Sequence, residues 1–463
     1  MKRKIVIIGS GIGGLVTGYL LTKQGDHVII LEHDQHPGGC LQAFYRDGIR
    51  FDTGFHFVGG LAEGGPLHKF FNELGLLTLP WKNLTEQEIW IGDKSYIVPT
   101  GGEEAWFNYF ADKFPKQKEN LKTFIKVCKD VINCPFSETM PYWEQNAWEW
   151  FCKTIDDPTL RNVISGSSMI VELNKETLPL FAFAEIVYSY IHSSCRLVDG
   201  GQAIIDHLLG YIQSQGGEIH CSTSITRIAE VDGKVVGVEL KEGRTIDADI
   251  VVSSIHPAET LKLLSPNTSM RKTYQHRISQ LKDSLGSFTC NIKLKKNMLK
   301  IHDMPIYIHR EGAEIWSYNH DPIDHILVHC YPEQNALDII APISWECFKQ
   351  WDGTTVGHRG KDYETYKTEI FEQCISLAEI ALPNLRNAID KAWTSSPLTW
   401  KSYFLSHNGT SYGVCKDCNA PEITLLLPRT PLKGLYLSGQ SIILHGIMGT
   451  TISSFITAEF LKK

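Results

Sequence analysis

Glycines near the start of the chain, followed by one acidic residue, are the first residues with an evident chemical use. Gly9, Gly11 and Gly14 have the spacing G-x-G-x-x-G. The first two let the backbone turn tightly and approach a pyrophosphate with no Cβ in the way, and the third lets the next segment pack closely. The carboxylate of Glu32 can accept hydrogen bonds from a ribose diol. The pattern therefore predicts a site for a dinucleotide.

Three elements must position these residues. Residues 5–8 are a continuous apolar run, as a parallel strand covered on both faces requires. A helix should begin within the glycine turn, so that its N-terminal amides and the positive end of its dipole face the phosphates. A second strand should end at Glu32. Because strand, turn, helix, strand and acid occur in this order, they favour a βαβ nucleotide-binding unit over a glycine turn without a ligand.

Bulk composition limits the class of protein. The chain has 463 residues, of which 43% are hydrophobic and 21% charged, which suits a globular enzyme of two or three domains. A net charge of −7 with scattered Lys and Arg argues against a nucleic-acid partner. Twelve irregularly spaced cysteines and the lack of a recognisable export signal predict a cytoplasmic protein with reduced thiols. No apolar stretch of about 18 residues occurs, so we expect no membrane span, while peripheral contact with a membrane is left open.

Two short patterns could hold a metal ion, and we expect that neither does. Cys415 and Cys418 have C-x-x-C spacing, but no second pair of similar spacing exists, and a zinc site normally needs four ligands. His33 and His36 lie in the turn after the strand assigned to nucleotide binding. The sequence therefore predicts no metal site.

Further stretches point to the cofactor and to a family. The doublet Gly38–Gly39 after Glu32 is similar to the FAD-specific extension of flavin oxidoreductases. Residues 48–60 (GIRFDTGFHFVGG), 197–228 and 434–460 resemble segments of the phytoene desaturase, carotenoid isomerase and retinol saturase family, and the first, with the doublet, looks closest to the retinol saturase branch. The resemblance implies an α/β fold with a Rossmann-type, glutathione-reductase-like FAD-binding domain and an inserted α+β substrate domain, an amine-oxidase-like architecture.

The resemblance also implies which residues contact FAD. It brings the backbone at Ile225 to the adenine and the backbone near Gly439 to the phosphate and ribityl chain. A helix beginning near Gly446 would aim its amides at the pyrimidine edge of the flavin. Gln440 stands where related enzymes carry an acid, and its amide can still bind a ribityl hydroxyl. The expected FAD-binding residues are Gly9, Ser10, Gly11, Ile12, Gly13, Gly14, Glu32, His33, Gly38, Gly39, Gly54, Ile225, Gly439, Gln440, Gly446, Met448 and Gly449.

The chain is expected to build two domains from alternating pieces. The FAD-binding domain should contain residues 1–75, 195–262 and 398–463, because the first and last pieces both reach the flavin. The substrate domain should contain residues 76–194 and 263–397. No second G-x-G-x-x-G unit follows, so the chain has no separate NAD(P)H domain and needs an external electron donor or acceptor.

The substrate domain has two unusually apolar stretches. Residues 178–192 (LPLFAFAEIVYSYIH) predict a helix that is either buried core or the wall of an apolar tunnel. Trp143, Trp148 and Trp150 cluster in a segment that suits packed core, a lid or a membrane interface. Together with the resemblance, these stretches favour an apolar polyene isoprenoid, such as a carotenoid or retinoid, as substrate. The expected function is that of an FAD-dependent oxidoreductase acting as a desaturase, a saturase or a redox-neutral isomerase.

Three side chains are candidates for moving protons at the flavin. His56 lies in the segment expected beneath the flavin, His445 precedes the last helix, and Tyr412 lies in a stretch that resembles the family's approach to the flavin. Each could equally be a hydrogen-bonded core residue. Two alternatives stay open: a flavin amine oxidase acting on a small amine, with Lys293 or Lys295 near the flavin, and a non-catalytic flavin-binding carrier of polyenes.

Overall fold

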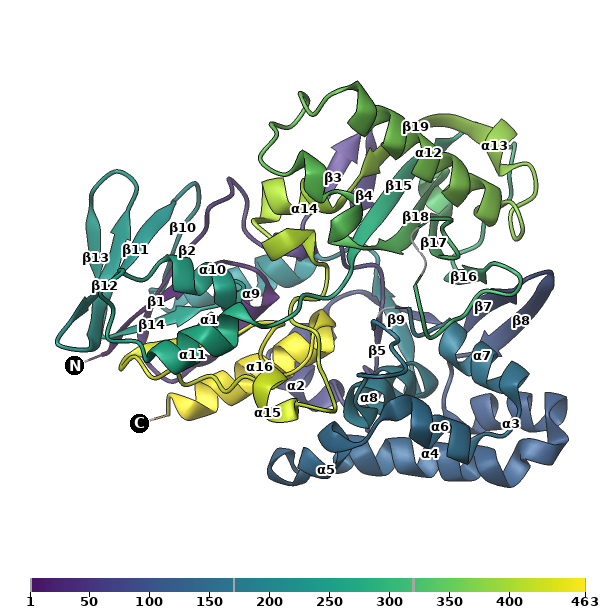
Figure 1. Cartoon of the computed structure of the whole chain (residues 1–463), viewed down its shortest axis with the longest axis horizontal. Coiled ribbons are helices and arrows are strands. Elements are labelled where there is room, and N and C mark those ends of the chain that lie inside the picture. The colour runs from purple at the N-terminus through teal and green to yellow at the C-terminus, as the bar shows by residue number, and fades with distance from the viewer. Residues whose placement is uncertain (1, 170, 319–320, 463) are drawn as a thin grey trace.

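A parallel β-sheet carries the glycine motif and takes strands from both ends of the chain (Figure 1). The computed structural model describes residues 2–169, 171–318 and 321–462. Within them, this parallel sheet has five strands in the order β10-β2-β1-β14-β20. The strand expected at residues 5–8 is present, and its apolar run is buried on both faces. The strands are β1 (Lys4–Ile8), β2 (His27–Leu31), β10 (Glu218–His220), β14 (Ile250–Ser253) and β20 (Leu435–Leu437).

Helices cover one face of the parallel sheet, and a small antiparallel sheet covers the other. α1 packs against both α9 and α16, and their apolar side chains form one core with β1 and β2. On the opposite face, β12 packs against β14. In Figure 1, both chain ends lie in the half of the molecule that contains the parallel sheet. The elements are α1 (Ile12–Lys23), α2 (His68–Glu73), α9 (Gln202–Ser214), α10 (Pro257–Lys262), α11 (Lys272–Ser279), α15 (Pro421–Thr424), α16 (Gly446–Phe460), β11 (Ile225–Val231), β12 (Lys234–Leu240) and β13 (Thr245–Asp247).

A second, mixed sheet forms the other half of the molecule. In the described part of the chain it has seven strands in the order β19-β15-β18-β17-β16-β7-β8. Its pairs are antiparallel except β16 with β7. The strands are β7 (Glu86–Ile91), β8 (Lys94–Pro99), β15 (Gly286–Leu294), β16 (Ile306–His309), β17 (His325–Tyr331), β18 (Ala336–Ile343) and β19 (Ile389–Ser395).

Both faces of the mixed sheet are buried at its centre. Alternate residues of a strand point to opposite faces. Ile326, Val328 and Ile339 pack with α12 (Lys361–Ala378) and α13 (Leu385–Ala388) in one core. Leu327 and Ile340, on the other face, line the cavity described below. Every residue of β17 is buried, so the polar side chains of this strand are also removed from solvent.

A layer of helices packs beside the mixed sheet (Figure 1). The segment 178–192 forms α8, most of whose residues belong to the core of this layer, although Ile186, Ser189 and Tyr190 line the cavity. Trp143 is buried and Trp148 and Trp150 are partly buried against the same core, so these tryptophans are packed core. The helices are α3 (Glu103–Lys113), α4 (Lys118–Asn133), α5 (Met140–Glu144), α6 (Ala147–Thr154), α7 (Pro158–Gly166) and α8 (Leu180–His192).

Short strands connect the two halves. β5, β9 and β6 form a small sheet, and the hairpin of β3 and β4 packs on the mixed sheet, where Phe51 contacts Tyr331. The strands of the parallel sheet all come from the segments expected for the FAD-binding domain. The strands of the mixed sheet all come from the segments expected for the substrate domain. The exact domain boundaries stay a prediction. No described helix combines the length and apolar character needed to cross a membrane. The bounds are β3 (Ala43–Arg46), β4 (Ile49–Asp52), β5 (Val58–Gly59), β6 (Trp81–Leu84) and β9 (Ser194–Leu197).

One buried carboxyl group in α8 makes stability depend on pH. Glu185 is 3% exposed, its Oε2 has no hydrogen-bond partner, and burial raises its pKa from 4.5 to about 8. The folded state therefore holds a proton that the unfolded chain releases, and this group lowers stability as pH rises from 4.5 to 8. We expect Glu185→Gln to lose less stability than the parent chain over this range, by a difference on the order of 2–4 kcal/mol at pH 8.

Urea unfolding of the two proteins at several pH values measures this difference. Glu104→Gln in the exposed first turn of α3 is the matched control and should follow the parent chain. Parallel stability curves for Glu185→Gln and the parent would contradict the expectation.

Candidate active site

A cavity of about 530 Å³ lies between the two sheets, at the carboxyl ends of β1, β14 and β20. Ligands of open α/β folds bind at this end of the strands. The turns that follow β1, β2, β14 and β20 all contribute to the wall, and the mixed sheet contributes Ser287, Thr289, Leu327 and Ile340. The volume is in the range of pockets for cofactors and drug-sized ligands.

Glycines let three backbone segments meet beneath the cavity. A Cβ on Gly13 would lie 2.7 Å from the Cα of Gly439, and a Cβ on Gly14 would lie 2.0 Å from the carbonyl oxygen of Gly9. Gly39 approaches Gly11 almost as closely, since a Cβ on Gly39 would lie 3.1 Å from the Cα of Gly11. Any side chain at Gly13 or Gly14 would push these segments apart. Gly11, by contrast, has open space around its missing side chain, where a cofactor can approach the backbone.

Glu32 holds the glycine turn against the segment after β2. Its Oε2 accepts hydrogen bonds from the backbone N–H of Ser10 (2.9 Å) and from the Ser10 hydroxyl (2.5 Å). Its Oε1 accepts a hydrogen bond from the N–H of Asp34 at 2.8 Å. The Ser10 hydroxyl accepts a further hydrogen bond from the N–H of Gly38 at 3.1 Å. A carboxylate offers about four acceptor positions, so Glu32 can shape the turn and still accept from a ribose hydroxyl.

The C-terminal segment completes the same wall. Gly439 has a positive φ of 95° and, with Gln440, lines the cavity directly after β20. α16 begins at Gly446, and its first turn borders the cavity. The hydroxyl of Ser454 donates to the carbonyl oxygen of Gly13 at 3.1 Å, which joins α16 to the start of α1. Two helix N-termini therefore reach the cavity, an arrangement that favours bound phosphates and other electron-rich groups.

The structure brings almost all of the expected FAD-binding residues to this cavity. Two glycines are exceptions: Gly14 packs on Gly9, and a Cβ on Gly449 would lie 2.5 Å from the Cβ of Leu444. Both therefore act in packing, and their assignment as direct contacts stays a prediction. The wall of close backbone approaches and free helix amides fits a dinucleotide cofactor. The lining members are Gly9, Ser10, Gly11, Ile12, Gly13, Glu32, His33, Gly38, Gly39, Gly54, Ile225, Gly439, Gln440, Gly446 and Met448.

The three candidate proton-transfer residues also line the cavity. Tyr412 and His445 lie together, with ring centroids 4.5 Å apart. Burial raises the pKa of Tyr412 to about 12, so its phenol is neutral at physiological pH. Burial lowers the pKa of His56 to about 4, so its imidazole is also neutral. Tyr412 and His56 thus place uncharged hydrogen-bonding groups at the cavity.

The lysines expected in the amine oxidase alternative lie elsewhere. Lys293 pairs with Asp47 at 2.5 Å, and Lys295 donates to the carbonyl oxygen of Asn387 at 3.0 Å. Among the described residues that line the cavity, Lys262 is the one lysine. Neither Lys293 nor Lys295 is therefore placed to act at the flavin.

Nothing in the sequence indicates that several of the lining residues belong to a binding site. Leu327 and Ile340 look like ordinary strand residues, and only the register of β17 against β18 places them side by side. Their apolar alternation reveals a strand but does not tell which of its faces meets a cofactor.

A histidine–aspartate bridge at the cavity was also missed. Asp283 Oδ1 lies 3.0 Å from Nε2 of His256, and Asp283 Oδ2 accepts a hydrogen bond from Nδ1 of His407 at 2.6 Å. Although burial raises the pKa of Asp283, these two histidines hold it at about 2. The histidine rings stack 4.6 Å apart. The bridge joins the segment after β14 to residues 407–409, which are distant in the sequence, so spacing alone could not reveal it.

Two glycine substitutions separate cofactor binding from folding. We expect Gly11→Ala to leave the stability of the apoprotein within about 0.5 kcal/mol, because its Cβ points into open space, yet to weaken FAD binding at least tenfold. Gly13→Ala should destabilise the apoprotein by about 1–3 kcal/mol, because its Cβ meets the backbone of Gly439. Thermal unfolding of apoproteins and FAD titration by fluorescence measure the two effects.

Gly210→Ala is the matched control, since Gly210 is an exposed residue of α9 with open space around it. It should bind FAD as the parent does. Normal FAD binding by Gly11→Ala would argue against the cofactor lying over this turn.

Comparison with known proteins agrees with the geometry. A model of the family "Flavin containing amine oxidoreductase" matches residues 12–458. The chain is 24% identical to the all-trans-retinol 13,14-reductase of Rattus norvegicus, over 100% of this chain and 86% of that protein. It is 25% identical to the chloroplastic prolycopene isomerase of Daucus carota, over 98% of this chain and 79% of that protein. The structure of cyclohexylamine oxidase from Brevibacterium oxydans superimposes with a TM-score of 0.63 at 13% identity, over 100% of both chains.

These findings confirm the predicted resemblance and the amine-oxidase-like fold. Relatives from the retinol saturase and carotenoid isomerase groups both align over nearly the whole chain. The family model itself extends from the glycine turn to the last helix. The chain belongs to the flavin containing amine oxidoreductase family and is an FAD-dependent enzyme.

Proposed function

We propose that this enzyme reduces or isomerises the double bonds of an apolar isoprenoid polyene of retinoid or carotenoid type. The observation that carries the proposal is the character of the cavity beyond the glycine turns. There the wall is built from apolar side chains of three elements, among them Leu327, Ile340 and Ile186, with Phe57 and Tyr190 beside them. The names of the relatives, a retinol reductase and a prolycopene isomerase, point to the same substrate class.

An apolar wall is the recognition that such a substrate needs. A polyene has few polar groups, so its affinity must come from buried apolar area, at roughly 25 cal/mol per Å². Phe57 and Tyr190 have rings that can lie flat against a conjugated chain. Because the apolar residues come from α8, β17 and β18, the wall is part of the packed interior and keeps its shape without a substrate.

A small amine suits this wall less well. An ammonium group leaving water needs a carboxylate or another acceptor nearby. Among the described lining residues the acids are Glu32, Asp34 and Glu259. Glu32 holds the glycine turn, and Glu259 is paired with Lys262. These three acids thus belong to the nucleotide-binding segments. Among the described lining residues, no carboxylate lies in the apolar wall, where an ammonium group would need one.

The chain's own polar groups can position the reacting bond and move a proton. Tyr412 is a neutral phenol, and His56 is a neutral imidazole, so neither adds a charge that would repel an apolar substrate. Burial around both excludes water from the reacting double bond. FAD in its reduced form supplies hydride chemistry. Its electrons must come from an external donor, because the sequence contains no second dinucleotide-binding motif.

We also propose that the enzyme works in the cytoplasm and meets its substrate at a membrane surface. All twelve cysteines are free thiols, as in a reducing compartment. α14 (Pro397–Phe404) and the residue after it contribute Tyr403 and Leu405 to the cavity wall, and these side chains are 51% and 52% exposed. Exposed apolar side chains at the rim of an apolar cavity give a lipid-soluble substrate a route in from a bilayer.

The substrate class is tested with purified holoenzyme reduced anaerobically with dithionite. All-trans-retinol or a carotenoid in liposomes should give one of two results. Either the flavin is reoxidised and the product is heavier by two hydrogens, or the flavin stays reduced and the product is an isomer of unchanged mass. The oxidised holoenzyme should not be reduced by putrescine or cyclohexylamine. Reduction by an amine, together with inert retinoids and carotenoids in both redox states, would replace this proposal by amine oxidation.

Membrane contact is tested by flotation of the holoenzyme with phospholipid liposomes. Replacing Tyr403 by Ser and Leu405 by Asn should reduce the bound fraction several-fold; Asn suits position 405 because φ there is +52°. Ile97→Thr, on the exposed edge strand β8 of the mixed sheet, is the control and should float as the parent does. Equal flotation of all three proteins would exclude this rim as the contact.

A further inference from the structure

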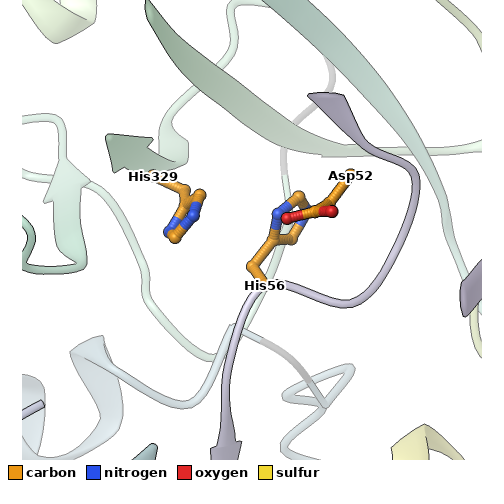
Figure 2. A group of neighbouring side chains, drawn as sticks. All are labelled: Asp52, His56 and His329. Carbon is orange, nitrogen blue, oxygen red and sulfur yellow. The ribbon is translucent and has the colours of Figure 1, made fainter. Parts of the chain in front are cut away.

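A group of buried polar side chains lies next to the cavity on the inner face of the mixed sheet. In the register of β17 and β18, Leu327 pairs with Ile340 at the cavity wall, and His329 pairs with Asp338 one step further along the same face. Asn291 of β15 pairs with Asp338 on the other side. Figure 2 shows Asp52 and His56, from the N-terminal segment around β4, converging with His329. We call the polar members of this group the His56 cluster: Asp52, His56, Asn291, His329, Tyr331 and Asp338.

Asp338 is the centre of the His56 cluster and is completely buried. Its Oδ1 accepts a hydrogen bond from Nδ2 of Asn291, and its Oδ2 accepts one from the hydroxyl of Tyr331, both at 2.6 Å. Burial nevertheless raises the pKa of Asp338 to about 8, against these two hydrogen bonds, and nearby Asp52 raises it further. The group is therefore a carboxylic acid at neutral pH, with a proton available inside the protein.

His56 connects this acid to the cavity. Its ring lines the cavity, while its Nδ1 is buried, has no hydrogen-bond partner and lies 4.0 Å from Oδ2 of Asp338. This distance exceeds that of a hydrogen bond, so a proton transfer between the two atoms requires the ring to turn toward Asp338. Burying an imidazole nitrogen without a hydrogen-bond partner reduces the stability of the fold, and such groups are therefore rare outside functional sites. Here it faces a protonated carboxyl group.

Charged neighbours favour a proton over a metal ion in this cluster. Asp52, His56 and His329 are residue types that bind metals, and their side-chain atoms lie within 4.8 Å of one another. The guanidinium of Arg50, however, lies 3.7 Å from Oδ1 of Asp52. Burial keeps the pKa of His329 far below its usual value, and the positive charges of Arg196 and Arg50 lower it further. A divalent cation would have to bind against both guanidinium groups.

We propose that His56 carries a proton between Asp338 and the double bond of the bound polyene. This inference rests on the proposed function. In the direction of reduction, the O–H bond of Asp338 breaks and an N–H bond forms at Nδ1 of His56. The N–H bond on the other ring nitrogen breaks, and a C–H bond forms at the substrate carbon. Bound reduced FAD would supply the hydrogen and the electron pair of the second new C–H bond as a hydride, and the external donor would reduce the cofactor again.

The carboxylate left on Asp338 is stabilised where it forms. Asn291 and Tyr331 already donate to its two oxygens and hold the negative charge. A solvent proton then binds the cavity-side nitrogen of His56, and the Nδ1 proton returns to Asp338, so both groups regain their starting state. His56 contacts the substrate in this scheme and is catalytic, whereas Asp338 acts through His56 and is a positioning and proton-storing residue. The titratable groups that face Asp338 are His56, His329 and Tyr331 from β17, and Asp52 from β4, and its charge also interacts with the thiols of Cys290 and Cys330. The positive charges of Arg50 and Arg196 act on Asp52 and His329.

The test uses the dithionite-reduced holoenzyme with all-trans-retinol in single turnovers from pH 6 to 9. Because the acid must be protonated, the parent rate should fall as pH rises through about 8. Asp338→Asn keeps the size of the side chain and one acceptor oxygen but removes the acid. The rate should therefore fall 10²–10³-fold, and the decline of the rate near pH 8 should vanish.

Controls distinguish a proton function from a structural one. Tyr331→Phe removes one hydrogen bond that stabilises the carboxylate, so the decline of the rate should move to higher pH and should not vanish as in Asp338→Asn. All variants should retain FAD and retinol binding, measured by fluorescence. Infrared difference spectra at neutral pH should contain the C=O band of a protonated carboxyl group that Asp338→Asn abolishes, a readout that needs no turnover.

The outcomes separate the two proposals. Parent enzyme that converts no polyene in either redox state overturns the proposed function and this role with it. Active parent enzyme with an unchanged rate and pH profile in Asp338→Asn overturns the proton role alone. A stoichiometric divalent metal in the purified protein that is lost in His329→Ala would also overturn it and would assign the cluster to metal binding.

Discussion

Close contact between backbones beneath the cavity is the constraint on which the rest of the structure depends. Gly13 at the start of α1 lies against Gly439 after β20, and Gly39 lies against Gly11. These contacts bring the turns after three strands of the parallel sheet within reach of one cofactor. The hydrogen bonds of Glu32 and Ser454 then fix the turns in place. Side chains are absent where the segments meet, so the surface offered to the cofactor is made of amides and open space.

The mixed sheet imposes a different constraint, because its inner face is buried although it carries polar groups. Leu327 and Ile340 give the apolar part that meets the cavity, and Asp338 and His329 lie beside them on the same face. A buried polar group must find a partner or change its protonation state. Asp338 does both, since it accepts two hydrogen bonds and holds its proton. The same burial that shapes an apolar wall thus prepares an acid next to it.

The sequence predicts the nucleotide-binding half far better than the substrate half. Gly9, Gly11 and Glu32 can be assigned because the βαβ unit is local and its residues recur at fixed spacing. The C-terminal segment around Gly439 could be joined to it only through a resemblance between families, since no physical rule links residues so distant.

In the substrate half, the positions of functional side chains depend on strand register. Asp338 and His329 come together only because β18 pairs with β17 in one register, and a shift of either strand by one residue would put the two side chains on opposite faces of the sheet. The bridge between His256, Asp283 and His407 likewise depends on tertiary packing. His56 is the exception, because it lies within a family-like stretch and could be named in advance, although its buried partner could not.

The joining of α1 to α16 also determines when the protein can fold during synthesis. Ser454 and Gly13, which bond to each other, are 441 residues apart in the chain. β1 and β2 each have an unpaired edge until β10 and β14 have been synthesised. β14 then has an unpaired edge until β20, at residues 435–437, has left the ribosome. Apolar strands with unpaired edges are prone to aggregation. Chains of this kind depend on chaperones that shield nascent hydrophobic segments, and yield in a cell depends on the supply of those chaperones as well as on final stability.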